Sequence, residues 1–308
     1  MSISFDPTHC TLCPRRCGAD RTRPPYGFFQ SSLKPKAALA AVHRFEEPPI
    51  SGTRGSGAVF FSGCALRCIF CQNAAISWQN QGVSLTTTEL AETFLSLQSQ
   101  GVHNINLVTA GHFLPSVIDA LHLAKNQGLT IPVVYNSSGY ETVEAIAALE
   151  GLVDIYLPDI KYYDSALSAE FSACPDYFAV AEKAILEMVR QVGPAQFDPN
   201  GLMTRGVILR HLILPGCRSD SKAILSWIKD TLADTVYVSL LRQYVPMYRA
   251  KEHPLLRRRL TTFEYEDVID YFLSLGLTHG FRQEKSSASA IYTPVFDGSG
   301  LIRKEETT

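Results

Sequence analysis

The sequence predicts an α/β fold, a partial barrel of about six strands preceded by a cysteine-rich extension. Short apolar runs rich in β-branched and aromatic residues alternate with segments whose apolar residues recur at helical spacing. Such alternation is typical of a parallel sheet with helices outside it. About six strands suit a partial barrel better than a closed eight-stranded one.

Strands and helices are predicted in strict alternation from residue 58 onward. The strand segments are residues 58–61, 104–109, 131–136, 152–157, 206–213 and 236–241. The helical segments are residues 88–97, 115–124, 141–149, 177–192, 221–232 and 262–275. A threonine cap and an acidic first turn open the first helix, and a proline at an early helical position opens the second.

Three regions of the chain are expected. Residues 1–55 are rich in proline, arginine and cysteine and have little periodicity, so they form either an independent module or an arm that wraps the rest. Residues 56–285 hold the barrel, and residues 286–308 form a C-terminal tail. The residues after Gly300 are expected to fray.

The composition argues against several classes of function. Hydrophobic residues make up 46% and charged residues 19% of the 308, as in ordinary globular proteins. The net charge of −2 provides no general attraction to nucleic acid or anionic membranes. No apolar stretch approaches the ~18–20 residues of a membrane span, and the N-terminus lacks a signal-peptide pattern. Because the eight cysteines are clustered rather than spread as a disulfide framework, we expect a cytoplasmic protein.

Three cysteines follow the first predicted strand, at Cys64, Cys68 and Cys71. Their spacing allows thiolates on one short loop to converge on a soft metal centre. A structural zinc takes four protein ligands, whereas a cubane iron–sulfur cluster held by three thiolates keeps one iron open. An open iron can chelate the amine and carboxylate of S-adenosylmethionine (SAM). The alternatives are a zinc loop that lacks a ligand and buried cysteines that only pack.

This loop resembles the cluster loop of the radical SAM superfamily. The chain is further similar to a subgroup of that superfamily related to pyruvate formate-lyase activating enzymes. The matching segments are EEPPISG at 46–52, HNINLVT at 103–109, VVYNSSGY at 133–140, YLPDIK at 156–161, HLILPG at 211–216 and VSLL at 238–241. The resemblance therefore extends from about residue 10 to about residue 285.

A second cysteine segment contains Cys10, Cys13 and Cys17 within CTLCPRRCG. A second iron–sulfur cluster, a zinc ion and a metal-free loop are all consistent with this spacing. Members of the subgroup usually have a fourth cysteine after a glycine–aromatic pair, where this chain has Phe29. A missing fourth donor weakens the case for a metal in this segment.

The resemblance implies a radical mechanism. The three loop cysteines would hold a [4Fe–4S] cluster, and SAM would bind its open iron. An electron from an external low-potential donor of the flavodoxin or ferredoxin kind would then cleave SAM to a 5′-deoxyadenosyl radical. That radical would abstract a hydrogen atom from the substrate, while the protein positions the reactants and excludes water.

The resemblance also assigns residues to SAM. Phe70 and Gln72 are expected beside the adenine, and Gly111 beside the methionine end. Asp159 and Lys161 match an Asp-x-Lys pattern that contacts SAM in the activating enzymes. Asp159 suits the ribose hydroxyls as an acceptor, and Lys161 suits the carboxylate as a point charge. A surface ion pair after a strand is the alternative.

Several other residues near predicted strand ends are left with open roles. Asn136 and His211 are expected to line the pocket, although a core histidine is equally consistent with His211. His112 is a candidate ligand, proton donor or helix-cap partner. Cys174 and Cys217, outside both clusters, are expected to pack or to face solvent.

Three functions are compatible with these features. The first is an activase that installs a glycyl radical on a partner enzyme. The second is a radical SAM enzyme with another protein or a small molecule as substrate, which the N-terminal cysteines favour slightly. The third is a metal-binding scaffold without turnover. A nucleic-acid module with zinc loops is the least supported, because neither loop is flanked by a basic stripe with spaced aromatics.

Overall fold

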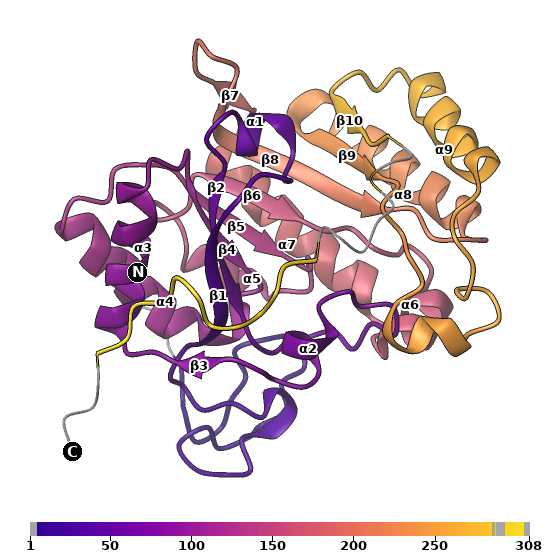
Figure 1. Cartoon of the computed structure of the whole chain (residues 1–308). Helices are drawn as coiled ribbons and strands as arrows, with labels where there is room; N and C mark the ends of the chain where they lie inside the picture. The colour runs from indigo at the N-terminus through magenta and orange to yellow at the C-terminus, as the bar shows by residue number, and fades with distance from the viewer. Residues whose placement is uncertain (1–4, 285–286, 288–292, 305–308) are drawn as a thin grey trace.

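The computed structural model describes residues 5–284, 287 and 293–304. Its strands are β1 (Lys36–His43), β2 (Ser56–Phe61), β3 (Val83–Ser84), β4 (Ile105–Val108), β5 (Val133–Ser137), β6 (Ile155–Pro158), β7 (Gln196–Phe197), β8 (Met203–Leu212), β9 (Tyr237–Leu241) and β10 (Gly280–Arg282). They form one curved sheet in the order β10-β9-β8-β6-β5-β4-β2-β1-β3, with β7 beside β8 (Figure 1). The six predicted strands are confirmed as β2, β4, β5, β6, β8 and β9, and they pair in parallel.

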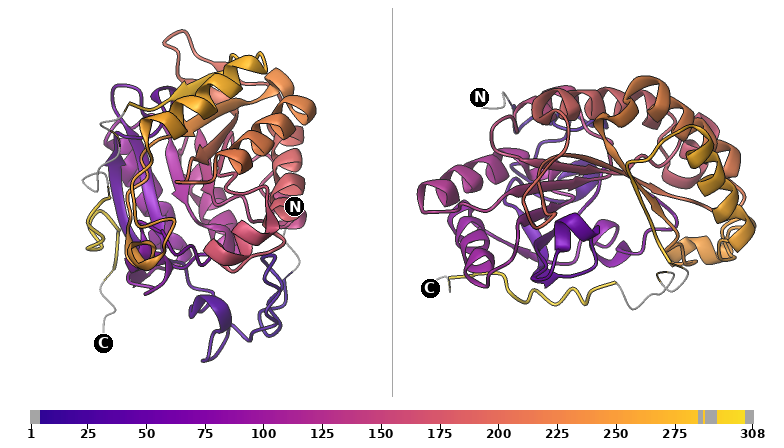
Figure 2. Two further views of the ribbon diagram at one scale, coloured as in Figure 1. Left: turned by 90° about the vertical axis from the view of Figure 1, so that its right-hand side faces the viewer. Right: turned by 90° about the horizontal axis from the view of Figure 1, so that it is seen from above.

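Helices cover the outside of the curved sheet (Figure 2). The α-helices are α1 (Pro48–Ser51), α2 (Ala74–Ser77), α3 (Thr87–Ser99), α4 (Leu114–Asn126), α5 (Val143–Ala147), α6 (Ser165–Ser172), α7 (Tyr177–Val192), α8 (Arg218–Thr231) and α9 (Thr262–Ser274). Short 3₁₀ helices are η1 (Gly27–Phe29), η2 (Gly111–Phe113), η3 (Ala233–Thr235) and η4 (Tyr248–Glu252). The six predicted helices correspond to α3, α4, α5, α7, α8 and α9, which together with the parallel strands confirms the partial-barrel prediction.

Two local predictions differ from the structure. The threonine that caps α3 is Thr86, which forms a reciprocal capping box with Glu89, so the helix begins earlier than predicted. Helix α6 has no predicted counterpart. Its N-terminus is capped by Asp164, whose carboxylate accepts hydrogen bonds from the backbone N–H groups of Ala166 and Leu167.

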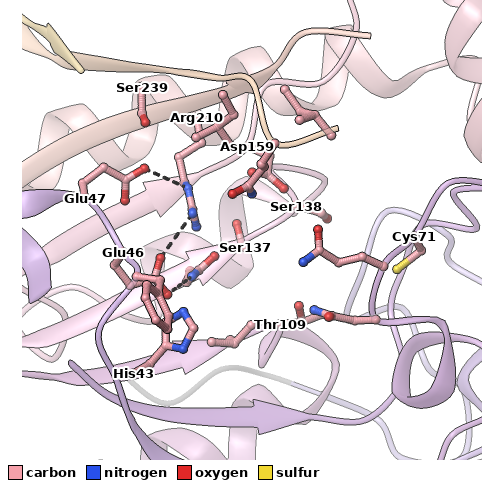
Figure 3. A pocket seen from close by; sticks show the side chains of 18 of the residues that line it. His43, Glu46, Glu47, Cys71, Thr109, Ser137, Ser138, Asp159, Arg210 and Ser239 are labelled. Atoms are coloured by element: carbon pink, nitrogen blue, oxygen red, sulfur yellow. Dashed lines mark hydrogen bonds and ion pairs between the residues drawn. The ribbon is translucent and has the colours of Figure 1, made fainter. Parts of the chain in front are cut away.

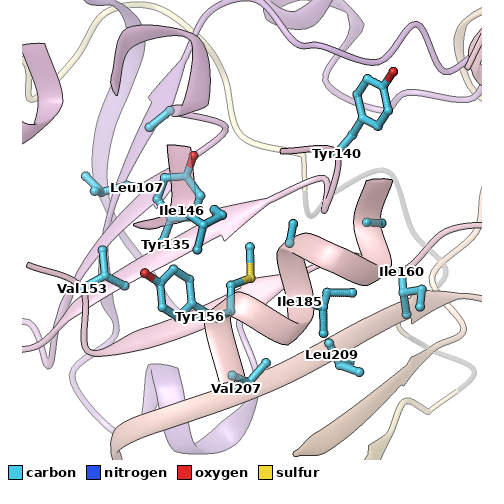
Figure 4. Close-up of a cluster of buried hydrophobic side chains, with 14 of the residues drawn as sticks. Leu107, Tyr135, Tyr140, Ile146, Val153, Tyr156, Ile160, Ile185, Val207 and Leu209 are labelled. Atoms are coloured by element: carbon cyan, nitrogen blue, oxygen red, sulfur yellow. The ribbon is translucent and has the colours of Figure 1, made fainter. Parts of the chain in front are cut away.

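The outer face of the sheet packs against the helices in a continuous apolar core. The side chains in Figure 4 come from both layers: Leu107, Tyr135, Tyr156, Val207 and Leu209 from the strands, with Ile146 and Ile185 from α5 and α7. All seven are fully buried. Full burial of a large apolar side chain contributes about 1.5–3 kcal/mol, so this layer holds the helices against the sheet.

The inner face of the sheet, the lumen of the partial barrel, has an apolar floor. Val134 and Ile208 form a buried cluster there with Ile50 of α1. Side chains two residues apart lie on the same face of a strand. Asn136 and Arg210 therefore follow Val134 and Ile208 as the next layer toward the carboxyl ends of the strands. The floor closes one end of the lumen, and the polar layer lies directly above it.

Part of the predicted N-terminal extension belongs to the sheet. Strand β1 lies within residues 1–55 and pairs in antiparallel fashion with β2. The residues before β1 lie below the sheet in the view of Figure 1, where they are drawn in indigo. The division of the chain near residue 55 stays a prediction.

The predicted fraying after Gly300 is wrong for residues 301–304, and residues 305–308 lie outside the described residues. The backbone N–H of Ile302 donates to Thr93 Oγ1 at 3.1 Å, and that of Lys304 donates to Glu89 Oε1 at 2.7 Å. Leu301 is buried. Two side chains of α3 therefore accept hydrogen bonds from the backbone of residues 301–304. The sequence of this segment alone gives no sign of these partners.

Across the described part of the chain, we find no helix with the length and apolar character needed to cross a bilayer.

The docking of this C-terminal segment is testable by truncating Leu301. We expect Leu301→Ala to lower the free energy of unfolding by about 2 kcal/mol, because a buried leucine is lost. Urea denaturation measures this change. Leu273→Ala is the matched control, since Leu273 is 58% exposed on α9 and should cost less than about 0.5 kcal/mol. Equal losses for the two variants would contradict the docked arrangement.

Candidate functional site

The turn after β2 begins the site. Gly63 has a φ of +91°, and a Cβ there would lie 2.8 Å from Nε2 of His112, so both conformation and space require glycine. His112 Nε2 donates to the carbonyl of Ser62 at 2.6 Å, which holds the turn. The cysteine loop of residues 64–71 follows this turn. The cavity that its cysteines line is also lined by Val108 at the end of β4, Ser137 at the end of β5 and Asp159 directly after β6.

That cavity has a volume of about 780 Å³ (Figure 3). Cys64, Cys68 and Cys71 all line it, together with residues from both sides of the lumen. Its size is that of a pocket for a small molecule or a cofactor. The cysteines and the polar strand ends therefore face the same cavity.

Each of the three cysteine sulfurs has a hydrogen-bond partner. These partners are the backbone N–H of Leu66 for Cys64 at 3.4 Å, the hydroxyl of Ser172 for Cys68 at 3.0 Å, and the hydroxyl of Ser77 for Cys71 at 3.1 Å. Burial raises the pKa of all three thiols, that of Cys71 to about 11, and Cys68 raises the pKa of the other two further. A raised pKa keeps these thiols protonated at pH 7, so a bound cationic metal centre would be needed to hold them as thiolates.

The loop offers three thiols, which are the soft donors that iron–sulfur clusters take. A cubane held by three cysteines binds each of them to a different iron atom. Among the described residues, no three His, Cys, Asp or Glu side chains are arranged to hold one metal ion. The three thiols that face this cavity have the chemistry of a cubane's ligand set, and their role as ligands stays a prediction.

Asp159 and Lys161 form an ion pair on the cavity wall. Lys161 Nζ donates to Asp159 Oδ2, and the two side chains are 16% and 26% exposed. Burial disfavours the charged form of Lys161, but Asp159 and the thiolates of Cys68 and Cys64 outweigh it and raise the pKa of the ammonium. Lys161 is thus a permanent cation between a carboxylate and the cysteine loop, not part of a surface ion pair.

Phe70, Gln72 and Asn136 also line the cavity, so the structure brings them together with the cysteines and the ion pair. Their roles toward SAM stay predictions. Thr109 is a further wall residue that sequence reasoning missed as a site residue. Its φ of +62° is rare for a β-branched residue, and such strain, about 1–3 kcal/mol, often accompanies functional sites.

The structure places Gly111 away from the cavity, contrary to its predicted position beside SAM. Gly111 is buried in η2 and is not among the cavity-lining residues. A Cβ on Gly111 would lie 2.5 Å from Oε2 of Glu141, whose pKa burial raises to about 8. The glycine is therefore explained by packing against this buried carboxyl group.

The two histidines with open roles are structural. Nδ1 of His211 contacts the carbonyl of Ile160 at 2.7 Å and its Nε2 contacts Ser221 Oγ at 2.8 Å, so both ring nitrogens have partners. His112 is buried, and burial lowers its pKa to about 3. Neither histidine lines the cavity. The expectation that His211 lines the pocket is therefore wrong, and its alternative as a core histidine holds.

A charged cluster in the lumen was not recognised as a site from the sequence. Arg210 Nη2 lies 3.2 Å from Glu46 Oε2, and Arg210 Nε lies 3.1 Å from Glu47 Oε1. All three residues line the cavity (Figure 3). The available signals were the consecutive glutamates before Pro48-Pro49 and an arginine directly after the apolar run at residues 207–209. Neither signal shows that the two segments meet.

The N-terminal cysteines lie in a separate segment outside the cavity. Cys10 and Cys13 are buried and Cys17 is exposed, and burial raises the pKa of Cys13 to about 12. The ring of Phe29 stacks on that of His112 with centroids 4.4 Å apart. The position of the subgroup's fourth cysteine is thus used for packing here. A second metal site at these cysteines stays a prediction.

Arg15 connects this N-terminal segment to the cysteine loop. Its Nε donates to the carbonyl of Ala65 at 2.8 Å, and its Nη1 and Nη2 donate to those of Ala173 and Ser172 at 2.6 and 3.3 Å. The guanidinium also lies 4.8 Å from the ring centre of Phe28. The N-terminal segment, the cysteine loop and the C-terminal end of α6 therefore meet at the side chain of Arg15.

Known proteins resemble this chain over different lengths. Residues 58–195 match the family model described as the radical SAM superfamily. The uncharacterized protein MJ0674 of Methanocaldococcus jannaschii is 29% identical over 274 residues, covering 85% of this chain and 73% of that protein. The pyruvate formate-lyase-activating enzyme of Clostridium pasteurianum is 33% identical over 111 residues, covering 34% of this chain and 45% of that enzyme.

Among solved structures, Streptococcus suis SuiB bound to its precursor peptide SuiA is similar with a TM-score of 0.50 and 12% identity. The match covers 72% of this chain and 47% of SuiB, so the chain spans less than half the length of that protein. At this identity the likeness concerns the fold.

The contacts of Arg15 predict that it stabilises the docked N-terminal segment. We expect Arg15→Ala to lower the free energy of unfolding by about 2 kcal/mol, because hydrogen bonds from a charged group are lost. Chemical denaturation gives this value, and limited proteolysis should show faster cleavage before β1. Arg16→Ala is the control, since the neighbouring Arg16 is exposed. Equal behaviour of the two variants would disprove the role of Arg15.

Proposed function

Since residues 58–195 form a radical SAM domain, we propose that this chain cleaves SAM reductively at a [4Fe–4S] cluster bound by Cys64, Cys68 and Cys71. The resulting radical takes a hydrogen atom from a substrate held in the same cavity. The observation that carries the proposal is that three thiols and the Asp159–Lys161 pair line one cavity. Radical SAM proteins use this cluster and SAM as cofactors.

When bound, the cluster and SAM supply a one-electron cleavage of the sulfonium to a 5′-deoxyadenosyl radical. The residues of the chain bind and orient the reactants. Lys161, held charged by Asp159, presents an ammonium suited to the carboxylate of SAM, and Asp159 presents acceptors suited to the ribose hydroxyls. Gln72 and Asn136 add amide groups to the wall.

Buried aromatic rings stand behind one wall of the cavity. Phe70 lines the cavity, and its ring lies edge-on to those of Tyr162 and Tyr244, with centroids 6.5 and 6.2 Å apart; all three residues are buried. Phe60 and Leu66 add apolar side chains to the lining. In the proposed reaction this apolar surface limits the access of water to a carbon radical, which protects the radical from side reactions.

The substrate divides the proposal into two versions. In the first, the substrate is the glycine loop of a partner enzyme, which the partial likeness to the Clostridium pasteurianum activating enzyme supports. In the second, it is another protein or a small molecule, which the buried charges of Glu46, Glu47 and Arg210 favour because a glycine loop offers no charge to pair with them. In both, an external low-potential donor of the flavodoxin or ferredoxin kind supplies the electron.

Replacing a cluster cysteine tests the core of the proposal. After anaerobic reconstitution with iron and sulfide, Cys68→Ala should lose detectable formation of 5′-deoxyadenosine from SAM and dithionite, because one iron lacks its ligand. Chromatography quantifies the product. Cys217→Ala is the control, since Cys217 is a buried cysteine outside the cavity, and it should keep wild-type activity. Product formation by Cys68→Ala at the wild-type rate would refute the ligand assignment.

Iron quantification tests the role of the N-terminal cysteines. We expect the reconstituted protein to hold about four iron atoms per chain, as one cubane requires. Joint replacement of Cys10, Cys13 and Cys17 by alanine should leave this content unchanged, since Phe29 cannot supply a fourth ligand. About eight iron atoms, falling to about four in the triple variant, would instead establish a second cluster.

A further inference from the structure

A buried cluster of charged side chains lies at the lumen end of the cavity, away from the cysteine loop (Figure 3). We infer that Glu46 and Glu47, positioned by Arg210, form a subsite that binds a protonated primary amine of the substrate. This inference rests on the proposed function, which places the substrate in this cavity. Three observations carry it: the charge balance, an unpaired carboxylate oxygen and the rigid support of both glutamates.

The first observation is an excess of negative charge. The side chains of Glu46 and Glu47 are 5% and 4% exposed, and one guanidinium, that of Arg210, pairs with both. Lys161 is already paired with Asp159. Two buried carboxylates therefore share one buried guanidinium at this end of the cavity, since the other arginines of the lining, Arg44 and Arg282, are exposed. Burying an unbalanced charge is costly. A cationic group on the occupant of the cavity removes this imbalance.

The second observation is the state of individual oxygens. Glu46 Oε1 accepts a hydrogen bond from Asn106 Nδ2 at 2.9 Å, and Glu46 Oε2 faces Arg210. Oε2 of Glu47 is buried and accepts no hydrogen bond from the described residues. Leaving such an oxygen unpaired costs about 1–3 kcal/mol or more, so buried polar atoms normally have partners. A donor from the substrate would satisfy this oxygen.

The third observation is that the backbone holds both glutamates in place. Glu47 directly precedes α1, and its carbonyl accepts from the backbone N–H of Ile50 at 2.8 Å. The N–H of Glu46 donates to Ser51 Oγ at 3.0 Å. Ile50 is anchored in the apolar floor of the lumen. The carboxylates are therefore pre-organised, which lowers the cost of binding a ligand.

An ammonium matches this subsite better than a guanidinium. A guanidinium presents five N–H donors in a flat fork, whereas the two glutamates offer one unpaired oxygen, Glu47 Oε2. Asn106 Oδ1 is also buried and unpaired, but Asn106 does not line the cavity. An ammonium is compact, and its three donors can rotate toward whichever acceptors are near. Both a free alkylamine and the side chain of a lysine in a peptide carry this group.

Calorimetric titration of the reconstituted full-length protein, with SAM bound, tests the subsite. The probes are n-butylamine, the blocked amino acid Nα-acetyl-lysine amide, and 1-butanol as the neutral analogue. We expect both amines to bind and 1-butanol not to bind. Glu47→Gln should weaken amine binding at least about tenfold, which is about 1.4 kcal/mol. Tighter binding of the lysine derivative indicates a peptide source, and tighter binding of butylamine indicates a free amine.

A matched variant separates the subsite from general effects on the cavity. Glu284→Gln makes the same substitution at an exposed residue on the rim of the same cavity and should leave amine binding unchanged. Should Glu47→Gln fail to fold, Glu47→Asp keeps the charge beside Arg210 but retracts the carboxylate. It should also weaken binding of the amines.

Three results would overturn the inference: binding of 1-butanol as tight as that of butylamine, unchanged binding in the Glu47 variants, or loss of amine binding whenever SAM is present. The last result would mean that these carboxylates bind SAM instead. The failure of the proposed function looks different, because then the wild-type protein forms no 5′-deoxyadenosine. Product formation without amine binding refutes the subsite and leaves the proposed function intact.

Discussion

Parallel pairing of the central strands decides where the groups of the site lie. Val108 of β4 is paired with Phe60 of β2 on one side and with Asn136 of β5 on the other, so the three strands end at one level. Because the strands run in the same direction, the carboxyl ends of all three strands, and the loops that follow them, lie at the same edge of the sheet. The cysteine loop after β2, Thr109 after β4 and Asp159 after β6 therefore share one cavity.

The lumen below that edge is organised in layers. Alternation along each strand places Val134 and Ile208 in the apolar floor and Asn136 and Arg210 one layer above it. The short helix α1 completes the floor with Ile50 and, in the same turn, brings two glutamates to the arginine. Pairing with Arg210 offsets part of the cost of burying the two glutamates, and it connects a segment before the barrel to strand β8.

The residues of the site divide between the part of the chain that matches the family model and the parts that flank it. The radical SAM match covers residues 58–195, which include the loop cysteines and the Asp159–Lys161 pair. Glu46 and Glu47 precede this match and Arg210 follows it. The proposed cluster ligands and the ion pair thus lie in the matched part, and the proposed amine subsite lies in the flanking parts.

Local patterns in the sequence determined the elements and the cysteine loop. The apolar runs of β2 and β4, and the helical periodicity over the 16 residues of α7, depend on neighbouring residues, so they could be identified without coordinates. The spacing of Cys64, Cys68 and Cys71 is likewise a local signal.

Tertiary structure decided which distant residues meet. A lone glycine or histidine near the end of a strand looks the same in the sequence whether its side faces a ligand or the core. Gly111 packs against Glu141, and His211 pairs with Ile160 and Ser221, because side-chain direction depends on packing between elements. In the Glu46–Glu47–Arg210 cluster, the arginine lies more than 160 positions along the chain from the glutamates. Such a contact follows from the closure of the lumen, and no local pattern in the sequence contains it.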